Sequence, residues 1–263
     1  MAIEVMMRHE NKYLVDGEKY SKLQSRLSQY MELDVYNKQS ELYTISNIYY
    51  DTDDNNLVRA SISKPGYKEK LRVRAYGAPA RADMVFVEIK KKYDGVVIKR
   101  RCAFALSEAY EFLESHNIEP KEYMNAQVLK EIDYFIRLHA PKPKLYLAYE
   151  RRAYVGENDL RVTFDTNVRT RRHDLRLEKG SYGDKLLDDD VWLVEIKTNG
   201  AIPLWLTEIL SELRIYSQGY SKYGEEYQRR LEMERTGGCL DLYSMSQMKL
   251  QPSRCKVFLP RLA

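Results

Sequence analysis

The chain has 263 residues, 44% hydrophobic and 31% charged, enough to bury a sizeable core in one large domain or two small ones. A formal net charge of +4 is too balanced to indicate a nucleic-acid-binding protein, and three widely spaced cysteines argue against a disulfide framework or a zinc site. No segment approaches about 18 consecutive apolar residues and the N-terminus does not resemble a signal peptide, so we expect a cytoplasmic protein without a membrane segment.

Strand-forming segments rich in β-branched and aromatic residues recur along the chain, and several are separated by Gly, Pro or Asp. In chain order the predicted strands are Glu4–Val15, Thr44–Asp51, Lys68–Tyr76, Met84–Lys91, Val96–Ala105, Leu145–Val155, Leu160–Val168, Arg171–Lys179 and Val191–Lys197. Helical patterns fall between them, over Glu18–Met31, Ser107–Ser115, Lys121–His139, Leu204–Tyr216 and Tyr223–Arg235.

So many short strands at close intervals are typical of a barrel rather than of a wound parallel sheet. The predicted fold class is therefore α+β, a closed antiparallel β-barrel with helices packed on the outside. We expect it to occupy residues 1–235, because the composition changes from Thr236 onward. Residues 236–263 are then a C-terminal tail whose role the sequence does not indicate.

One face of the predicted strands is ionic, since side chains on a strand alternate between two faces. In the third strand Lys70, Arg72 and Arg74 share one face, whereas Leu71 and Val73 share the other. The same alternation groups Arg8, Glu10, Lys12, Glu88, Lys90, Lys99, Arg101, Tyr149, Arg151, Arg161, Thr163, Asp165, Glu195 and Lys197 on the ionic faces of their strands.

For any single strand, a charged face is ordinarily the solvated outside of a barrel. Here Arg and Lys recur at every second position with few intervening Ser, Thr or Gln, whereas a solvated face mixes both signs more evenly. The amphipathic helices could cover the apolar faces and so turn the ionic faces inward. Such an interior must be wet, because burying about ten unpaired ions at several kcal/mol each would exceed a folding stability of roughly 5–15 kcal/mol.

An open bore lined with Arg and Lys matches a ligand that carries negative charge along a line, such as a chain of phosphates. Carboxylates have no place in pure anion binding. Glu10, Glu88 and Glu195 are explained if a divalent cation, Mg²⁺ or Mn²⁺, accompanies the phosphates.

Several short motifs follow one another in a fixed order. They are Arg8–Tyr13, Ile48–Thr52, Lys70–Arg74, Val87–Lys90, Ile98–Arg101, Tyr149–Tyr154, Leu160–Asp165, Val194–Lys197 and Ser221–Tyr223. In order and number they resemble the VTC domain, the polyphosphate polymerase member of the triphosphate tunnel metalloenzymes. The hydrolase and cyclase members of that superfamily begin with Glu-x-Glu-x-Lys, and Arg8 in place of the first Glu favours the VTC side.

The resemblance implies an antiparallel barrel that forms a tunnel, and transfer of the γ-phosphate of ATP to a growing polyphosphate chain with a divalent metal such as Mn²⁺. Its motifs imply a catalytic set of Arg72, Arg74, Arg151, Arg161 and Lys222. The phosphate-binding set is Arg8, Lys12, Lys70, Lys90, Lys99, Arg101, Tyr149, Lys197 and Ser221, and the metal-binding set is Glu195, Glu10 and Glu88.

Two alternatives remain open. A tripolyphosphatase or nucleoside triphosphatase on the same fold would let water attack the phosphate, although the loss of the first-strand Glu argues against it. A non-catalytic module could bind polyphosphate or RNA, but RNA would need exposed aromatic residues and a wide groove. Because the tyrosines fall mostly on helices and apolar faces, we assign them to core packing. The expected partners are therefore ATP and inorganic polyphosphate or triphosphate, without nucleic acid, and the sequence leaves the oligomeric state open.

Overall fold

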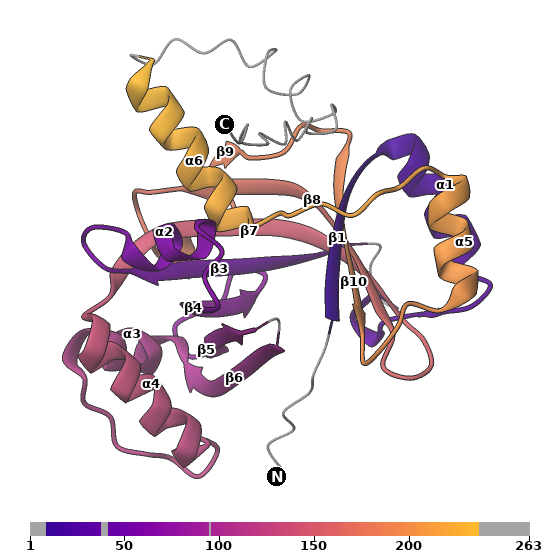
Figure 1. Cartoon of the computed structure of the whole chain (residues 1–263). Coiled ribbons are helices and arrows are strands. Elements are labelled where there is room, and N and C mark those ends of the chain that lie inside the picture. Colours follow the sequence, from indigo (N-terminus) through magenta and orange to yellow (C-terminus); the bar gives the residue numbers. More distant parts are fainter. Residues whose placement is uncertain (1–8, 38–41, 95, 237–263) are drawn as a thin grey trace, which may run out of the picture. The chain divides into compact units, whose positions relative to one another are not determined.

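The computed structural model describes residues 9–37, 42–94 and 96–236 (Figure 1). The chain divides into two compact units, Met1–Glu226 and Tyr227–Ala263, and the sheet and its site belong to the first. The expected tail over residues 236–263 lies almost entirely outside the described residues, so the division at residue 235 stays a prediction. Among the described residues no helix is long and apolar enough to span a membrane.

The first unit is built on a ten-stranded antiparallel sheet with the order β1-β10-β8-β7-β3-β4-β5-β6. Two short strands lie off this path, where β2 pairs with β7 and β9 pairs with β8. The strands are β1 (His9–Asp16), β2 (Glu32–Leu33), β3 (Tyr43–Asp51), β4 (Tyr67–Tyr76), β5 (Met84–Tyr93), β6 (Val96–Ala105), β7 (Lys142–Val155), β8 (Arg161–Arg171), β9 (Asp184–Lys185) and β10 (Val191–Thr198).

The antiparallel sheet and the α+β class agree with the prediction, but backbone hydrogen bonds do not close the sheet into a barrel. Within the described part of the chain, β1 pairs only with β10 and β6 pairs only with β5. Neighbouring strands in a ladder lie about 4.8 Å apart, whereas long side chains can link strands across a wider space. Glu10 of β1 reaches Lys90 of β5 in this way, with 3.2 Å between Oε2 and Nζ. The sheet is therefore curled, and ionic side chains link its two halves across the inner face.

Helices cover the outer, apolar face of the sheet in two groups (Figure 1). Phe112 and Ile132 of α3 and α4 pack with Val87 and Phe104 beneath β4–β6. Leu23 and Leu206 of α1 and α5 pack over β1, β8 and β10. The helices are α1 (Gly17–Leu27), α2 (Asn56–Ile62), α3 (Leu106–Ser115), α4 (Ala126–His139), α5 (Leu204–Glu212) and α6 (Lys222–Arg235), with the 3₁₀ turns η1 (Val35–Asn37) and η2 (Leu177–Lys179). The expectation that amphipathic helices cover the apolar faces and leave the ionic faces inside is confirmed.

The predicted strand over Arg171–Lys179 is wrong. β8 continues to Arg171, and a loop with the turn η2 follows. The buried guanidinium of Arg171 donates to the carbonyls of Arg176 (2.8 Å) and Gly180 (2.9 Å). In a sheet, backbone N–H groups of a neighbouring strand would donate to these carbonyls instead. Its Cζ also lies 3.4 Å from the centre of the Tyr146 ring. One arginine therefore organises this loop, and strand propensity does not decide its conformation.

Helix α2 was not predicted from the sequence. Its first turn is fixed by Asp51, a fully buried carboxylate at the end of β3. Asp51 accepts hydrogen bonds from the backbone N–H groups of Leu57 (2.9 Å) and Val58 (3.0 Å). A carboxylate at a helix N-terminus satisfies free N–H groups and favours a short helix whose own sequence pattern is weak.

Candidate active site

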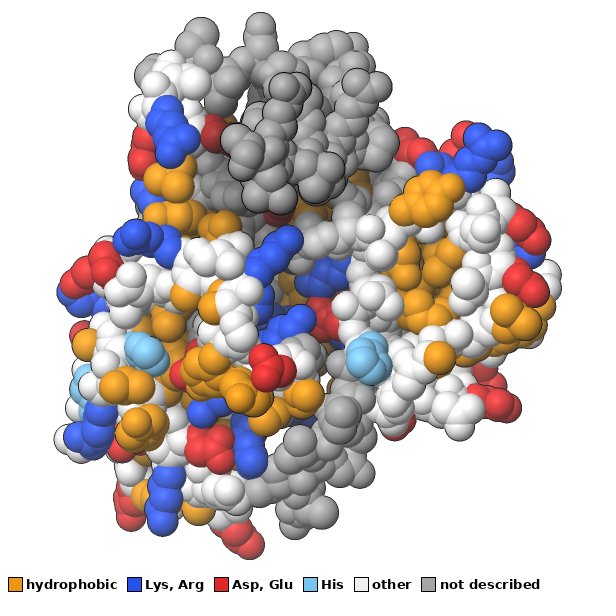
Figure 2. Space-filling model, in the orientation of Figure 1, with side chains coloured by type: hydrophobic (Ala, Val, Ile, Leu, Met, Phe, Trp, Pro, Cys, Tyr) orange, Lys and Arg blue, Asp and Glu red, His pale blue; other side chains and the backbone are white. Residues whose placement is uncertain are grey.

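The inner face of the curled sheet is ionic, as the alternation of side chains predicts. In the space-filling view Lys and Arg side chains gather, with Asp or Glu among them, at the centre of the molecular face shown (Figure 2). The candidate site contains ten cations from the inner face and the start of α6, which are Lys12, Lys70, Arg72, Arg74, Lys90, Lys99, Arg101, Arg151, Lys197 and Lys222. Four carboxylates lie among them, Glu10, Glu88, Asp165 and Glu195.

Two parts of this face differ in charge balance. The paired wall lies on β1, β7, β8, β10 and the start of α6, and comprises Glu10, Lys12, Arg151, Asp165, Glu195, Lys197 and Lys222. The arginine wall lies on β4, β5 and β6, and comprises Lys70, Arg72, Arg74, Glu88, Lys90, Lys99 and Arg101. The paired wall has nearly as many carboxylates as cations, whereas the arginine wall has one carboxylate for six cations.

Asp165 is at the centre of the paired wall and is fully buried. Arg151 holds it with two parallel bonds, Nε to Oδ1 at 2.6 Å and Nη2 to Oδ2 at 2.8 Å. Lys222 approaches the same carboxylate, with Nζ 2.5 Å from Oδ2. Burial raises the pKa of Asp165, but Arg151 and Lys222 outweigh it and hold this pKa below its usual value. The carboxylate therefore stays ionised and fixes both cations in place.

Glu10 and Glu195 converge on Lys12. The Lys12 Nζ lies 3.2 Å from Glu10 Oε1 and 3.3 Å from Glu195 Oε1, and Lys197 contacts the second oxygen of Glu195 at 3.0 Å. Burial raises the pKa of Glu195, but Lys12, Lys197 and Lys222 outweigh it and hold this pKa well below its usual range. Two ionised carboxylates thus lie next to each other on the strands β1 and β10, which are paired at Lys12 and Glu195.

The arginine wall is organised by Glu88, which is 1% exposed. Arg72 donates to Glu88 Oε2 through Nε at 2.8 Å, and Lys99 lies 2.5 Å from Oε1. Arg74 is 3.8 Å from the same carboxylate. Burial raises the pKa of Glu88, but these three cations lower it far more. A single carboxylate therefore orients three cations without neutralising them.

Three polar side chains orient the two arginines; Tyr149 was among the predicted site residues, whereas Asn47 and Tyr49 were not. Arg74 Nε donates to Asn47 Oδ1 at 3.0 Å, and Arg74 Nη2 donates to the Tyr149 hydroxyl at 3.1 Å. Arg72 Nη1 donates to the Tyr49 hydroxyl at 3.1 Å. Asn47 and Tyr49 lie two residues apart on β3 and face the arginines of β4, so the period-two alternation was the signal that could have found them.

Tyr149 and Lys70 connect the walls to each other and to α6. The ring of Tyr149 lies 4.4 Å from Lys222 Nζ and 5.1 Å from Arg151 Cζ, while its hydroxyl accepts from Arg74. Lys70 Nζ donates to Ser221 Oγ at 3.0 Å, directly before α6 begins. Burial, together with the positive charges of Lys12 and Lys90, lowers the pKa of Lys70 to about 7.

The remaining predicted site residues lie nearer the margins. Arg161 is bound by Asp34, with 2.5 Å between Nη2 and Oδ2. Arg101 is exposed, and its Cζ lies 4.5 Å from the centre of the Phe86 ring. Arg8 lies outside the described residues. Asp165, which joins Arg151 to Lys222, was missing from the predicted site although its place on the ionic face was recognised.

The residues of the paired wall fit a divalent cation. Mg²⁺ is ordinarily held by one or two carboxylates, with phosphate oxygens and water completing its coordination. Glu10 and Glu195 offer such a pair, although no group of three or more His, Cys, Asp or Glu that could hold a metal ion occurs in the described ranges. Glu88 belongs to a different environment, because Arg72, Arg74 and Lys99 are its partners.

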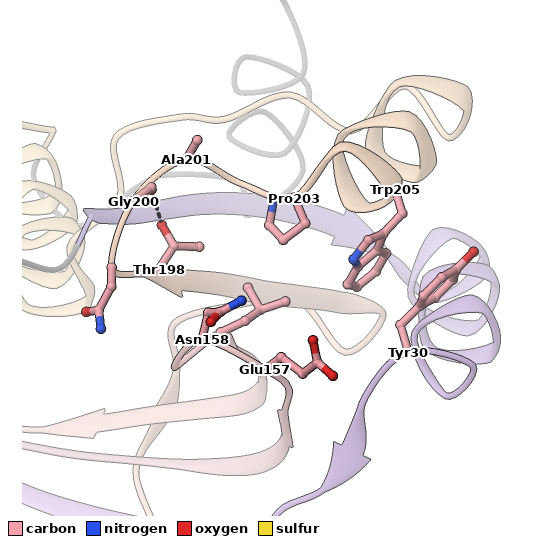
Figure 3. A pocket seen from close by; sticks show the side chains of 10 residues that line it. Tyr30, Glu157, Asn158, Thr198, Gly200, Ala201, Pro203 and Trp205 are labelled. Carbon is pink, nitrogen blue, oxygen red and sulfur yellow. Dashed lines mark hydrogen bonds between the residues drawn. The ribbon is translucent and has the colours of Figure 1, made fainter.

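A separate cavity of about 440 Å³ lies beside the turn after β7 and the loop after β10 (Figure 3). Tyr30 and Trp205 stack at one side of it, with 4.2 Å between ring centres, and Pro203 lies next to them. Glu157 and Asn158 contribute polar groups. None of its lining residues is Lys or Arg, so this cavity lacks the charge that a phosphate chain needs.

Comparison with known proteins identifies the family of this chain. The sequence model of the VTC domain matches residues 7–230. The chain belongs to the VTC domain family. Vacuolar transporter chaperone complex subunit 4 of Schizosaccharomyces pombe is 24% identical to this VTC domain over 195 residues, which are 64% of this chain. The match spans only 27% of the length of that relative.

Solved structures resemble this VTC domain at low sequence identity. A candidate adenylate cyclase from Bacillus halodurans has a TM-score of 0.49 and 17% identity, and the match covers 82% of this chain and 96% of the other. A candidate adenylyl cyclase from Hippeastrum, described as having a dominant triphosphatase activity, has a TM-score of 0.48 and 16% identity over 90% of this chain and 99% of the other.

Proposed function

We propose that this VTC domain is a metal-dependent polyphosphate polymerase that transfers the γ-phosphate of ATP to the end of a polyphosphate chain bound on the ionic inner face. Membership of the family supports the reaction, because polyphosphate synthesis is what the VTC resemblance implies. The finer assignments also remain part of this proposal. They are a sheet that acts as a tunnel, the site residues, Mn²⁺ or Mg²⁺, ATP, and a cytoplasmic location.

The observation that carries the proposal is the excess of cations on the arginine wall. Arg72 and Arg74 lie two residues apart on β4, so their guanidinium groups are about 6–7 Å apart along the strand. Lys70 continues the row, and Lys90 and Lys99 flank it on β5 and β6. Glu88, together with Glu10 of the paired wall, which contacts Lys90, cannot neutralise all of these groups. A phosphate chain supplies repeated negative charge along a line and would replace the missing counter-ions.

The mechanism we propose relies on position and electrostatics. In phosphoryl transfer the charge spreads over the equatorial oxygens of the transferred phosphate, and little covalent chemistry is left for the protein. Arg72 and Arg74 are held by Glu88, Asn47 and Tyr149, so they are oriented before the substrate binds. Fixed donors of this kind stabilise the transition state without reorganising.

On the opposite side, Arg151 and Lys222 are fixed by Asp165 and face the ring of Tyr149. They would orient the terminal phosphate oxygen of the acceptor chain for in-line attack. Glu10 and Glu195 would hold the divalent ion, which would shield charge on the phosphates when bound. The acceptor is a phosphate oxygen that is already deprotonated, so the reaction needs no general base.

The test is incubation of the purified protein with ATP and Mn²⁺, followed by gel staining for polyphosphate and assays of ADP and free phosphate. We expect a ladder of polyphosphate with stoichiometric ADP. Arg74→Met should lower the rate of synthesis by about 10²–10³-fold, the usual cost of one preorganised donor. Lys142→Met is the matched control, since it removes one cation from an exposed ion pair with Asp53.

Three results would contradict the proposal. Free phosphate without polymer would assign the domain to the triphosphatase alternative. Tripolyphosphate binding without turnover by the wild type, in Mn²⁺ or Mg²⁺, would assign it to a binding module. Equal activity of Arg74→Met and Lys142→Met would remove the arginine wall from the reaction. Glu195→Gln should abolish turnover while leaving metal-free binding of ATP measurable, which separates the metal site from phosphate binding.

A further inference from the structure

One end of the inner face changes from ionic to aromatic. Going along β4, the inward-facing residues are Lys70, Arg72, Arg74 and then Tyr76. On the neighbouring strand Phe86 stands directly opposite Arg74. Tyr43 of β3 is opposite Arg151 of β7. The row of cations therefore ends at a group of aromatic rings on the same face of the sheet.

These rings form a compact cluster, the tyrosine platform, made of Tyr36, Tyr43, Tyr76 and Phe86. Tyr36 and Tyr76 are stacked, with 5.5 Å between ring centres and 7° between ring planes. Tyr43 lies 5.8 Å from Tyr36 and 6.2 Å from Tyr76, and Phe86 meets Tyr76 edge to face at 6.4 Å. Offset stacks and edge-to-face contacts of this kind are the preferred aromatic geometries.

Two rings of the platform are exposed, and the other two, Tyr43 and Phe86, are half-buried. Tyr36 is 57% exposed and Tyr76 is 42% exposed. The assignment of the tyrosines to core packing is therefore wrong for these two, as it is for other exposed tyrosines such as Tyr134 and Tyr216. Val35, next to Tyr36, is 67% exposed. A contiguous exposed patch of large apolar side chains ordinarily marks a binding surface.

The position of Tyr36 is fixed by its neighbours. Asn37, the next residue, is buried; its side chain donates to the Arg151 carbonyl at 3.2 Å and accepts from Ala153 N–H at 2.8 Å. Asp34 accepts from Tyr36 N–H at 3.1 Å. The turn η1 is thereby attached to β7, and the ring of Tyr36 is held against Tyr76 before any ligand arrives.

We propose that the tyrosine platform binds the nucleobase of the nucleoside triphosphate donor by stacking, while the cations of β4 hold its phosphates. This inference rests on the proposed function and adds to it the part of the substrate that the arginine wall cannot recognise. Tyr76 lies two residues beyond Arg74, about 6–7 Å along the strand, which is the order of length of a ribose. Aromatic rings stack on any base, so the platform favours nucleotides over bare phosphate chains and discriminates weakly between ATP and GTP.

Arg101 marks the boundary between the two surfaces. Its guanidinium lies over Phe86 at 4.5 Å, and its strand position is opposite Glu88. Glu88 is itself bound by Arg72 and Lys99. Arg101 is an exposed cation at the edge of the platform, where it would contact the phosphate nearest the ribose. The cationic surface and the stacking surface are therefore adjacent at Arg101.

The experiment compares two probes, ATP and inorganic tripolyphosphate, by isothermal titration in EDTA so that no turnover occurs. Tyr76→Ala and Tyr36→Ala should each weaken ATP binding about tenfold, as expected for one lost base–aromatic contact, and leave tripolyphosphate binding within about twofold. Tyr76→Phe should retain ATP affinity because the ring remains. Tyr134→Ala, an exposed tyrosine on α4, is the matched control and should change neither affinity.

Unchanged ATP affinity in both alanine variants would overturn the platform, and so would an equal fall for both probes. Alanine variants that lose binding to a short oligoadenylate strand but bind ATP normally would also contradict the proposal, because the platform would then bind nucleic acid. If the wild-type protein makes no polyphosphate but the alanine variants selectively lose ATP binding, the platform is supported and the polymerase assignment is contradicted. If the wild-type protein makes polyphosphate but the alanine variants do not selectively lose ATP affinity, only the platform is contradicted.

Discussion

The paired wall and the arginine wall face each other across the same curled sheet, yet they differ in how far carboxylates neutralise their cations. On the paired wall Asp165 and Glu195 hold Arg151, Lys222 and Lys12 at ion-pair distances. On the arginine wall Glu88 is the single carboxylate of the group. The first has nearly as many carboxylates as cations, whereas the second has an excess of cations that favours an anionic ligand.

This difference indicates that the two walls contribute differently to substrate binding. A network whose carboxylates remain ionised through lowered pKa values has a fixed geometry, because each group removed leaves another charge unpaired. A surplus of oriented cations instead favours any ligand that supplies the missing charge. We infer that the paired wall determines where the reacting groups lie, and that the arginine wall provides most of the affinity for phosphate.

The largest expected effect is on the paired wall. Asp165→Asn should lower the free energy of unfolding by about 3–5 kcal/mol, since it leaves Arg151 and Lys222 buried beside a neutral amide. Denaturant unfolding followed by circular dichroism measures this difference. Asp53→Asn removes a carboxylate from exposed pairs with Lys142 and Lys144, and it should leave unfolding nearly unchanged. Equal effects of the two substitutions would show that the paired wall is not a network.

Much of this site could be predicted from the sequence, because alternation along a strand is a local rule. Val73 faces the core and Arg72 and Arg74 face inward as the pattern of β4 predicts. The same holds for Val162 and Asp165 on β8. Once the amphipathic helices were taken as the cover of the apolar face, the ionic face had to lie inside the curl.

What could not be predicted depends on contacts between residues far apart in the chain. Arg171 shapes the loop after β8 through four backbone carbonyls, and Asp51 starts α2, so local propensity was overruled at both places. Tyr36 and Tyr76 were assigned to the core with the other tyrosines, which fall mostly on helices and apolar faces. The exposure of an amphipathic ring depends on tertiary packing, and both residues are exposed. Closure of the sheet depends on whether its edge strands meet, which no strand pattern encodes.

A smaller effect is expected from Lys70 on the arginine wall, where affinity should depend on pH. Its pKa is lowered to about 7, and a bound polyanion raises that pKa again. Binding therefore takes up a proton at pH 8. The contribution of Lys70 to tripolyphosphate affinity is nearly complete below about pH 6 and falls, by at most about tenfold per pH unit, as the pH rises through 7.

Titration calorimetry in two buffers of different ionisation enthalpy measures this proton uptake directly. Lys70→Met should reduce the uptake at pH 8 by up to one proton, whereas Lys142→Met should not change it. The apoprotein supplies an independent check of sign. Between pH 7 and 10.5 the unfolded chain binds more protons at Lys70 than the folded chain, so this residue makes unfolding less favourable as pH rises. A wild-type protein with no proton uptake at pH 8 would contradict the assignment.

The smallest effect concerns the attachment of α6 to the sheet. Tyr223 is 2% exposed and its hydroxyl donates to Asp51 at 2.9 Å, while Asp51 also accepts from two backbone N–H groups of α2. Tyr223→Phe should therefore cost about 1 kcal/mol of unfolding free energy, the net value of one hydrogen bond. Tyr216→Phe, at a 73% exposed tyrosine, is the matched control and should cost nothing measurable.

Tripolyphosphate affinity should remain within about twofold in Tyr223→Phe. Lys222, the neighbouring residue, is held independently by Asp165 of the paired wall at 2.5 Å, so its place does not depend on the tyrosine hydroxyl. A fall in affinity of tenfold or more at unchanged stability would contradict this independence. It would mean that Asp51, through Tyr223, positions the start of α6 for the phosphate chain, and that the paired wall extends from β8 and β10 to the end of β3.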